Sequence, residues 1–392
     1  MNFAGIDIAS ETHVLAVVSA AGEVQVRATP FGEDAQGYAL LFERLGPPEQ
    51  VVVAMEATGH YWKNLFAALG ARGYAVALIN PLRTRRFADE DLQRTKTDAI
   101  DALGIARFAA QKRPAITRLT DTATEELREL VRLRDRVVGE IGDRVRQLHR
   151  LVDLGFPEFT RYIPTLDTQI AIALLRQYPT AQAFVRVGPT RVSKLVYDGR
   201  HRVGPELARQ LVEAAHVSVG AHHGPAYRVQ VKYLCEDLET LRFRLRELDA
   251  DLERHLDDHE VGTLLTSIDG IGKLTAARLV AELGDPAEFA SASALAAYVG
   301  VIPALRQSGK GRTRTSLTSI GHRHLRHALW MPTLAAVRRN PWLRAYYQHL
   351  RSKGKPAKVA LIAAMRKLLI AVYAVARKRQ PFVPHIATEA QP

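Results

Sequence analysis

Cysteine is almost absent from this chain of 392 residues, which contains only Cys235. A single thiol excludes an intramolecular disulfide framework and a Cys-rich zinc site. The N-terminus has no basic segment followed by a cleavage signal, so we expect a cytoplasmic, nucleoid-associated protein. The longest apolar stretch, 359–376, is interrupted by Arg366 and Lys367. This interruption favours a buried helix over a membrane span and predicts no membrane partner.

Acidic residues are missing from one long interval. No Asp or Glu occurs between Glu288 and Glu389, whereas the same interval contains 18 Lys and Arg; the rest of the chain has 36 basic and 41 acidic residues. The net charge of +13 therefore originates in this C-terminal interval. A merely solvated basic face usually has acids interspersed. This charge density instead predicts a surface that binds nucleic acid.

The N-terminal third alternates between two kinds of element. The length, with 47% hydrophobic and 24% charged residues, predicts two or three domains with well-formed cores. Two apolar runs, 3–8 and 12–18, are separated by a polar turn and predict a β-hairpin. The elements expected after the hairpin are helix 33–45, strand 50–55, helix 59–72 and strand 74–79. This alternation predicts an α/β domain with a mixed sheet.

Two acids stand at the ends of these predicted strands. Asp7 ends the first apolar run, and Glu56 follows the strand at 50–55. In open α/β sheets, ligands bind outside the carboxyl ends of the strands, and a buried charge is costly unless it is paired or holds a metal. Each acid has an alternative role: Asp7 could order the turn that follows it, and Glu56 could cap a helix or form a salt bridge.

Two further acids occur at the start of a predicted helix. Thr97 can cap a helix that runs to about residue 111, and Asp98 and Asp101 then project from one face of it. Their alternative role is to complement the helix dipole. Four carboxylates brought together would form an oxygen site suited to Mg²⁺ or Mn²⁺. Two such metals could activate a nucleophile and stabilise the leaving oxygen in phosphodiester chemistry.

The middle of the chain has two heptad patterns. Apolar residues recur in steps of three and four between Leu127 and Val152, broken by Arg134, and again between Val231 and Leu252. The spacing predicts two long helices of the coiled-coil type. An intramolecular helical hairpin and an oligomerising coiled coil both fit, and we favour a homo-oligomer.

A glycine pair follows the second heptad segment. Gly270 and Gly272 precede Lys273 and separate two predicted helices, which is typical of a helix-hairpin-helix. The backbone N–H groups of such a turn and the next helix N-terminus can hold a DNA phosphate. A Gly-x-Gly turn can also be a simple helix connector. The basic C-terminal interval favours DNA contact.

A Gly-rich cationic loop lies further on. Ser308 is flanked there by Arg306, Lys310, Arg312 and Arg314. A hydroxyl among these cations stands where a phosphate would bind, and a nearby base or metal could activate it as a nucleophile. Most serines in such loops only keep the loop polar and have no catalytic role. The serines at positions 316 and 319 are alternative candidates for the nucleophile.

A series of motifs runs through nearly the whole chain. They are GIDIA at 5–9, MEATGHYW at 55–62, KTDAIDA at 96–102, SIDGIGKLTAA at 267–277, YVGVIP at 298–303, RQSGKG at 306–311 and GHRHLRHAL at 321–329. Together they resemble the DEDD-type insertion-sequence transposases, which are similar to Piv-type invertases. The resemblance implies a RuvC-like, RNase H-like DEDD catalytic domain at 1–120. It further implies a helical coiled-coil region at 121–258 and a mostly helical C-terminal transposase domain at 259–392, with a helix-hairpin-helix and a serine loop.

The resemblance also implies roles for single residues. Asp7, Glu56, Asp98 and Asp101 match the acidic quartet that binds Mg²⁺ or Mn²⁺. Ser308 matches the serine that attacks DNA and forms a transient covalent link. The protein would thus cut and rejoin DNA strands.

Partners follow from the same resemblance. It implies double-stranded DNA at element ends and target, a noncoding guide RNA encoded by the element, and an assembly of subunits, a dimer or a tetramer. One difference concerns positions 307–310, which read QSGK in this chain. The family often has Ser-Ser-Gly-Gly or Ser-Thr-Gly-Gly there, so Ser308 is the only serine of the motif.

Three other protein classes share some of these features. A sugar-kinase or actin-like ATPase also opens with a Gly-Ile-Asp-Ile strand, but this sequence has no second Asp-Gly-Gly phosphate loop. A non-enzymatic DNA-binding protein would leave the four acids without a role. A structure-specific junction endonuclease would use the acids but would not need Ser308, because water is its nucleophile.

Overall fold

The computed structural model describes residues 1–90, 97–118, 121–306, 314–317 and 321–384. The chain folds into two compact units, Met1–Thr120 and Asp121–Pro392, and each is described by itself.

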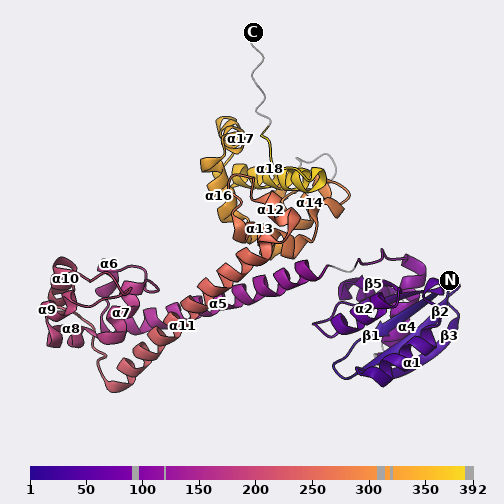
Figure 1. Ribbon diagram of the computed structural model, residues 1–392, viewed down its shortest axis with the longest axis horizontal. Coiled ribbons are helices and arrows are strands. Elements are labelled where there is room, and N and C mark those ends of the chain that lie inside the picture. The colour runs from indigo at the N-terminus through magenta and orange to yellow at the C-terminus, as the bar shows by residue number, and fades with distance from the viewer. Residues whose placement is uncertain (91–96, 119–120, 307–313, 318–320, 385–392) are drawn as a thin grey trace, which may run out of the picture. The chain divides into compact units, whose positions relative to one another are not determined.

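A five-stranded mixed sheet forms the centre of the first unit, in the order β3-β2-β1-β4-β5 (Figure 1). The strands are β1 (Asn2–Asp7), β2 (Thr12–Ser19), β3 (Val24–Gly32), β4 (Val51–Glu56) and β5 (Ala75–Ile79). Strand β1 pairs antiparallel with β2 and parallel with β4, and β4 pairs parallel with β5. The predicted hairpin and the mixed sheet are confirmed.

Helices cover both faces of this sheet. They are α1 (Ala35–Leu45), α2 (Trp62–Ala71), α3 (Pro81–Glu90) and α4 (Asp98–Lys112), with a 3₁₀ turn η1 (Pro48–Gln50) before β4. On one face, Leu41 of α1 and Leu65 of α2 share a core with Ile6 of β1. On the other face, Ile105 of α4 packs with Phe3 of β1. Alternate residues of each strand therefore supply two separate cores.

Two long antiparallel helices connect the two ends of the second unit (Figure 1). They are α5 (Thr122–Gly155) and α11 (Pro225–Asp257). Arg134 Nε lies 2.5 Å from Asp249 Oδ1, and Arg144 Nε lies 2.8 Å from Asp237 Oδ2, so the two helices are paired along much of their length. The two predicted heptad helices are present, while their assembly with other copies stays a prediction.

A cluster of short helices, which we call the tip domain (residues 156–223), lies at one end of this helical pair (Figure 1). Its helices are α6 (Phe159–Tyr162), α7 (Gln169–Gln177), α8 (Ala181–Val187), α9 (Pro189–Ser193) and α10 (Pro205–His216). Phe156, Phe159 and Phe184 are buried in its core together with Cys235 of α11. Burial raises the pKa of the Cys235 thiol to about 12, so this thiol is an apolar core group.

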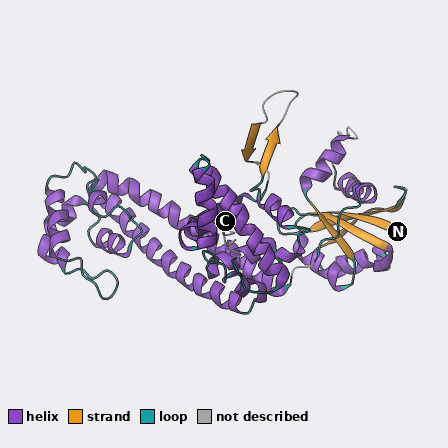
Figure 2. Ribbon diagram, turned by 90° about the horizontal axis from the view of Figure 1, so that it is seen from above, coloured by secondary structure: helices purple, strands orange, loops and turns teal. Residues whose placement is uncertain are grey.

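A mostly helical body lies at the other end of the pair. Its elements are α12 (Glu260–Leu265), α13 (Lys273–Leu283), η2 (Pro286–Glu288), α14 (Ala292–Val299), β6 (Pro303–Arg306), β7 (Arg314–Leu317), α15 (Arg323–Ala328), α16 (Trp330–Arg339), α17 (Pro341–Ser352) and α18 (Ala357–Lys378). Strands β6 and β7 form a two-stranded hairpin that projects from the helices and is drawn in orange in Figure 2. The predicted helical remainder of the chain is confirmed.

Helix α18 is long and apolar enough, by length and composition, to cross a membrane. In this fold it is the central helix of the body, and 56% of its most apolar stretch is buried. Met365, Leu368 and Leu369 are almost fully buried in a core shared with α12, α13 and α14. This packing is that of a core helix.

Candidate functional site

The two strand-end acids lie on neighbouring strands. Asp7 is the last residue of β1 and Glu56 the last of β4, and the residues before them, Ile6 and Met55, are paired in the parallel register. Because side chains alternate along a strand, Asp7 shares a face with Gly5, two residues earlier. Glu56 likewise shares a face with Ala54, which packs with α4 residues. Both acids therefore end their strands on the sheet face that α4 covers.

Helix α4 lies directly on β1 at Gly5. A methyl group at Gly5 would lie 2.2 Å from the carbonyl oxygen of Ala102 and 2.3 Å from the backbone nitrogen of Ala106. Only glycine allows this close approach of helix and strand backbones. Val14, which pairs with Asp7 across the hairpin, packs against Ala102.

The direction of α4 follows from these contacts. Its later residues Ile105 and Ala109 pack with Phe3 near the start of β1, whereas Ala102 packs beside the end of β1. The N-terminus of α4, with Asp98 and Asp101, is therefore directed toward the sheet edge at which Asp7 and Glu56 lie. Residues from three elements thus lie toward the same edge, which we call the acidic edge (Asp7, Glu56, Asp98 and Asp101).

Local hydrogen bonds order the acidic edge. Thr97 caps α4 as expected, because its Oγ1 accepts from the backbone N–H of Ile100 at 3.3 Å. Glu56 Oε1 accepts a 2.5 Å hydrogen bond from the hydroxyl of Thr84, a buried residue of α3. Thr84 thus fixes the direction of the Glu56 side chain. The sequence pattern did not single out Thr84, because the polar segment 81–90 has no clear apolar periodicity.

The donor set of the acidic edge suits a hard divalent cation, since all four side chains are carboxylates. In the described part of the chain, no group of three or more His, Cys, Asp or Glu side chains is close enough together to hold a metal ion. Like charges at one edge repel each other unless a cation lies between them, and this repulsion favours separated side chains. The residues therefore fit a metal by chemistry, while their side chains are not gathered into a metal site in this structure.

A buried histidine supports the turn that follows Asp7. His13 is fully buried; its Nδ1 accepts from the Ala9 N–H at 3.2 Å, and its Nε2 lies 2.6 Å from Glu33 Oε2. Nδ1 is therefore unprotonated and the Nε2–H donates to Glu33. Burial raises the pKa of Glu33, but hydrogen bonds from His13, Tyr38 and Asn64 outweigh burial and lower it overall. A charged Glu33 thus holds His13, and His13 holds the turn.

The predicted serine loop is carried by the β6–β7 hairpin. Pro303 pairs with Leu317, and Arg306 pairs with Arg314. Residues 307–313 connect the two strands, so Ser308, Lys310 and Arg312 lie outside the described residues.

The base of this hairpin is closed by two glycines. Gly300 and Gly321 have φ angles of 81° and 127°, and a methyl group on Gly321 would lie 2.5 Å from the Cα of Gly300. The next residue, His322, donates its backbone N–H to the Tyr298 carbonyl at 2.8 Å. Its Nε2 lies 3.1 Å from Glu282 Oε2. This bond is the main reason that the Glu282 pKa is lowered, against the opposing effect of burial.

The glycine turn before α13 packs against α16 at Gly270. Gly270 has a φ of 103°, and a methyl group there would lie 2.4 Å from the Ala336 side chain. Gly272 is the N-cap of α13, and Lys273 Nζ lies 2.6 Å from Asp257 Oδ1 at the end of α11. Gly270 thus has a packing role and Lys273 an ion-pair partner. Phosphate binding by this turn stays a prediction.

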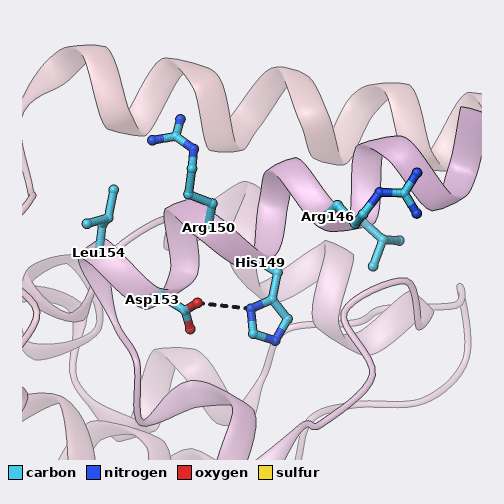
Figure 3. A pocket seen from close by; sticks show the side chains of 6 residues that line it. Arg146, His149, Arg150, Asp153 and Leu154 are labelled. Carbon is cyan, nitrogen blue, oxygen red and sulfur yellow. Dashed lines mark hydrogen bonds and ion pairs between the residues drawn. The ribbon is translucent and has the colours of Figure 1, made fainter.

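One open hollow of about 480 Å³ lies on α5 (Figure 3). Its lining includes His149 and Asp153, whose Nδ1 and Oδ2 atoms are 3.1 Å apart. None of the residues predicted for metal or DNA chemistry lines it. It therefore adds nothing to the acidic edge.

Comparison with known proteins finds relatives for both units. Residues 4–157 match a family model of IS110-type DEDD transposases, described as "Transposase", and residues 262–348 match the "Transposase IS116/IS110/IS902 family". An uncharacterized 43.6 kDa protein of insertion element IS110 from Streptomyces coelicolor is 29% identical over 309 residues, which are 78% of this chain and 76% of that protein.

Two further relatives cover more of the chain. An uncharacterized 44.8 kDa protein of insertion element IS116 from Streptomyces clavuligerus is 26% identical over 386 residues, which are 97% of this chain and 96% of the relative. The pilin gene-inverting protein of Moraxella bovis is 26% identical over 331 residues, which are 84% of this chain and 80% of the relative. The first matched segment contains the whole acidic edge, and the second contains the β6–β7 hairpin with position 308.

Proposed function

The chain belongs to the IS110 family of DEDD transposases, enzymes that act on DNA, and from this membership we propose that it cuts and rejoins DNA strands through a covalent link to Ser308. The observation that carries the proposal is the acidic edge, where Asp7 and Glu56 end neighbouring parallel strands beside the N-terminus of α4. A DNA-binding protein without catalytic activity has no use for four carboxylates there.

The acidic edge is proposed to hold Mg²⁺ or Mn²⁺ through Asp7, Glu56, Asp98 and Asp101. When bound, the metal would lower the pKa of a hydroxyl and stabilise charge on phosphate oxygens. Within the chain itself, the hydrogen bond from Thr84 keeps a Glu56 oxygen directed. The close approach of α4 to β1 fixes the distance between the two aspartates of the helix and the strand ends.

Ser308 is proposed to be the nucleophile of the reaction. Its Oγ attacks the DNA phosphorus, so that one P–O bond forms to the serine and one P–O bond to a deoxyribose oxygen breaks. The serine proton passes to a base, and the departing oxygen takes up a proton. The phosphoserine bond conserves the energy of the broken phosphodiester, so rejoining needs no cofactor.

Double-stranded DNA is the proposed substrate, with a noncoding RNA of the element as guide and a dimer or tetramer as the active assembly in the cytoplasm. Charge supports a nucleic-acid partner. Among the Lys and Arg residues of the described segment 321–384, only Arg379 forms an ion pair with a carboxylate, that of Asp285. Other cations of this segment, such as Arg338, Arg339, Lys353 and Lys358, are exposed and can bind phosphates.

Metal binding tests the acidic edge independently of activity. We expect the full-length protein to bind Mn²⁺ in isothermal titration calorimetry, and we expect Asp7→Asn, Glu56→Gln or Asp101→Asn to weaken that binding and abolish strand cleavage. Each variant should remain folded without metal, because Asn and Gln have the same size as the acids that they replace. Glu43→Gln on α1, exposed and outside the edge, is the matched control. Variants that bind Mn²⁺ and cleave like wild type would remove the edge from the mechanism.

A further inference from the structure

Apart from its first two residues, the tip domain lies outside both segments that match the transposase families. Those segments end at residue 157 and resume at residue 262. Between them the chain builds the five helices α6 to α10, whose core is shared with one end of the α5–α11 pair. The helical pair therefore places the surface of these helices at a distance from the helical body.

One segment of the tip domain is cationic. Five Lys or Arg side chains occur between residues 186 and 202, all of them exposed and none ion-paired to a carboxylate: Arg186, Arg191, Lys194, Arg200 and Arg202. The segment contains one acid, Asp198. We call these five side chains the tip cations.

The Asp198 carboxylate accepts hydrogen bonds from the neighbouring backbone. It accepts from the backbone N–H groups of Arg200 at 2.9 Å and His201 at 2.6 Å, and from the His201 ring at 2.6 Å. These bonds, the His201 N–H first among them, lower the pKa of Asp198 to about 2. Its charge therefore fixes the turn, and it can offset only one of the five tip cations.

The tip cations sit on an ordered framework. The backbone of Val196 bridges to that of Arg202, and the Gly204 N–H donates to the Ser193 carbonyl at 3.1 Å. The chain after α9 is thus folded back against the end of that helix. Gly199 has a φ of 82° and makes the reversal possible. Arg191, Lys194 and Arg202 are held near one another by this turn.

Other cations of the same region behave differently. Arg176 of α7 lies 2.5 Å from Glu239, and Arg209 of α10 contacts both Glu206 at 2.7 Å and Glu213 at 2.9 Å. An ordinary solvated surface has this mixture of signs. The excess of unpaired cations is therefore confined to the segment 186–202.

We propose that the tip cations form a second nucleic-acid-binding surface, which contacts the phosphodiester backbone without reading its sequence. The proposal rests on the proposed action of this protein on DNA. Unpaired Arg and Lys side chains bind backbone phosphates, and these contacts position a nucleic acid on the protein surface. The phosphates could belong to duplex DNA or to a structured RNA.

The length of the helical pair sets the distance between this surface and the helical body. Arg128 of α5 donates to the Ala281 carbonyl in the helical body, whereas Gly155 ends α5 at the tip domain. At ~1.5 Å per helical residue, these positions are roughly 40 Å apart, a little more than one turn of duplex. A duplex that contacts both the helical body and the tip cations would therefore be bound at two places about one helical turn apart.

Salt dependence of binding tests the proposal. We would compare the full-length protein with the triple variant Arg191→Gln, Lys194→Gln, Arg202→Gln on two probes, a 40-bp duplex DNA of arbitrary sequence and an RNA hairpin. Each lost phosphate contact should reduce the slope of log affinity against log salt by about 0.9 for duplex DNA. The triple variant should thus lose up to ~2.7 of slope. A loss with only one probe identifies the source of the phosphates.

The matched control removes the same charge from ion-paired sites, as Arg146→Gln, Arg209→Gln, Arg254→Gln. This control should keep the wild-type slope. An unchanged slope of the tip variant on both probes would overturn the proposal, as would an equal loss in the control. Single variants at Arg191 and Lys194, each with about one third of the effect, replace the triple variant if it does not fold. Binding is measured without cleavage, so a failure of Ser308 as nucleophile leaves this test intact.

Discussion

Gly5→Ala should separate the two halves of the acidic edge. The substitution adds one methyl group to β1 at the point where it touches α4. That methyl would lie 2.2 Å from the Ala102 carbonyl oxygen and 2.3 Å from the Ala106 nitrogen, both of them backbone atoms. Backbone of a packed helix cannot rotate away as a flexible side chain does, so α4 must move as a body.

The size of the effect follows from these distances. Restoring an ordinary contact requires α4 to shift by roughly 1 Å, and overpacking of this kind costs about 1–3 kcal/mol. The shift carries Asp98 and Asp101 away from Asp7. A displacement of about 1 Å in a catalytic arrangement can lower a rate by ~100-fold. We therefore expect a loss of cleavage much larger than the loss of stability would cause.

Hydrogen exchange and cleavage assays measure the two effects. Amides of 98–112 should exchange about 5- to 150-fold faster in Gly5→Ala if local opening is easier by about 1–3 kcal/mol. Gly104→Ala is the control within the same helix, because a methyl group there meets no atom within 4 Å. It should slow exchange slightly, since Ala is favoured over Gly in a helix by about 0.5–1 kcal/mol. Wild-type exchange and cleavage in Gly5→Ala would refute the packing of α4 on β1.

Three other results are expected. Thr84→Val should weaken cleavage while leaving the fold intact, because Glu56 loses the donor that directs it; unchanged kinetics would show that the bond is incidental. In Glu282→Gln, the free energy of unfolding should decrease less in acid than in wild type. The lowered pKa of Glu282 stabilises the folded protein above the ordinary pKa of a glutamate, and this stabilisation is lost as the pH falls from about 5 toward 3. Equal acid melting curves for both proteins would contradict this. Replacing the seven exposed Lys and Arg residues of 338–358 with Gln should reduce the salt slope for duplex DNA by about 0.9 per lost contact, and an unchanged slope would place the main nucleic-acid surface elsewhere.

Strong apolar patterns predicted the parts of the fold that are buried on both sides. Strands β1, β4 and β5 are continuous apolar runs, and their ends were predicted within one or two residues. Strand β3 was not predicted, because it is an edge strand whose side chains are mostly exposed and which therefore has no apolar run. The polar helix α3 was missed for the same reason, and with it the contact of Thr84 with Glu56.

Contacts between distant residues could not be predicted from spacing. Arg134 interrupts the heptad of α5, and only the fold shows that Asp249 of α11 pairs with it at 2.5 Å. Similarly, Gly270 fits a phosphate-binding turn by sequence, whereas the structure shows Ala336 packed against it. His13 and Glu33 are 20 positions apart and carry no local pattern. Such pairs depend on which elements pack together, which a single sequence does not specify.

The most direct measurement of the central claim is the chemical identity of the protein–DNA link. The protein would be incubated with Mg²⁺ and a radiolabelled duplex containing an element end, denatured, and digested to peptides for mass spectrometry. We predict a denaturation-resistant adduct on the peptide that contains Ser308, absent in Ser308→Ala and retained in Ser316→Ala and Ser319→Ala. Strand cleavage without any adduct, or an adduct that persists in Ser308→Ala, would contradict the account and favour hydrolysis by water as in a junction endonuclease.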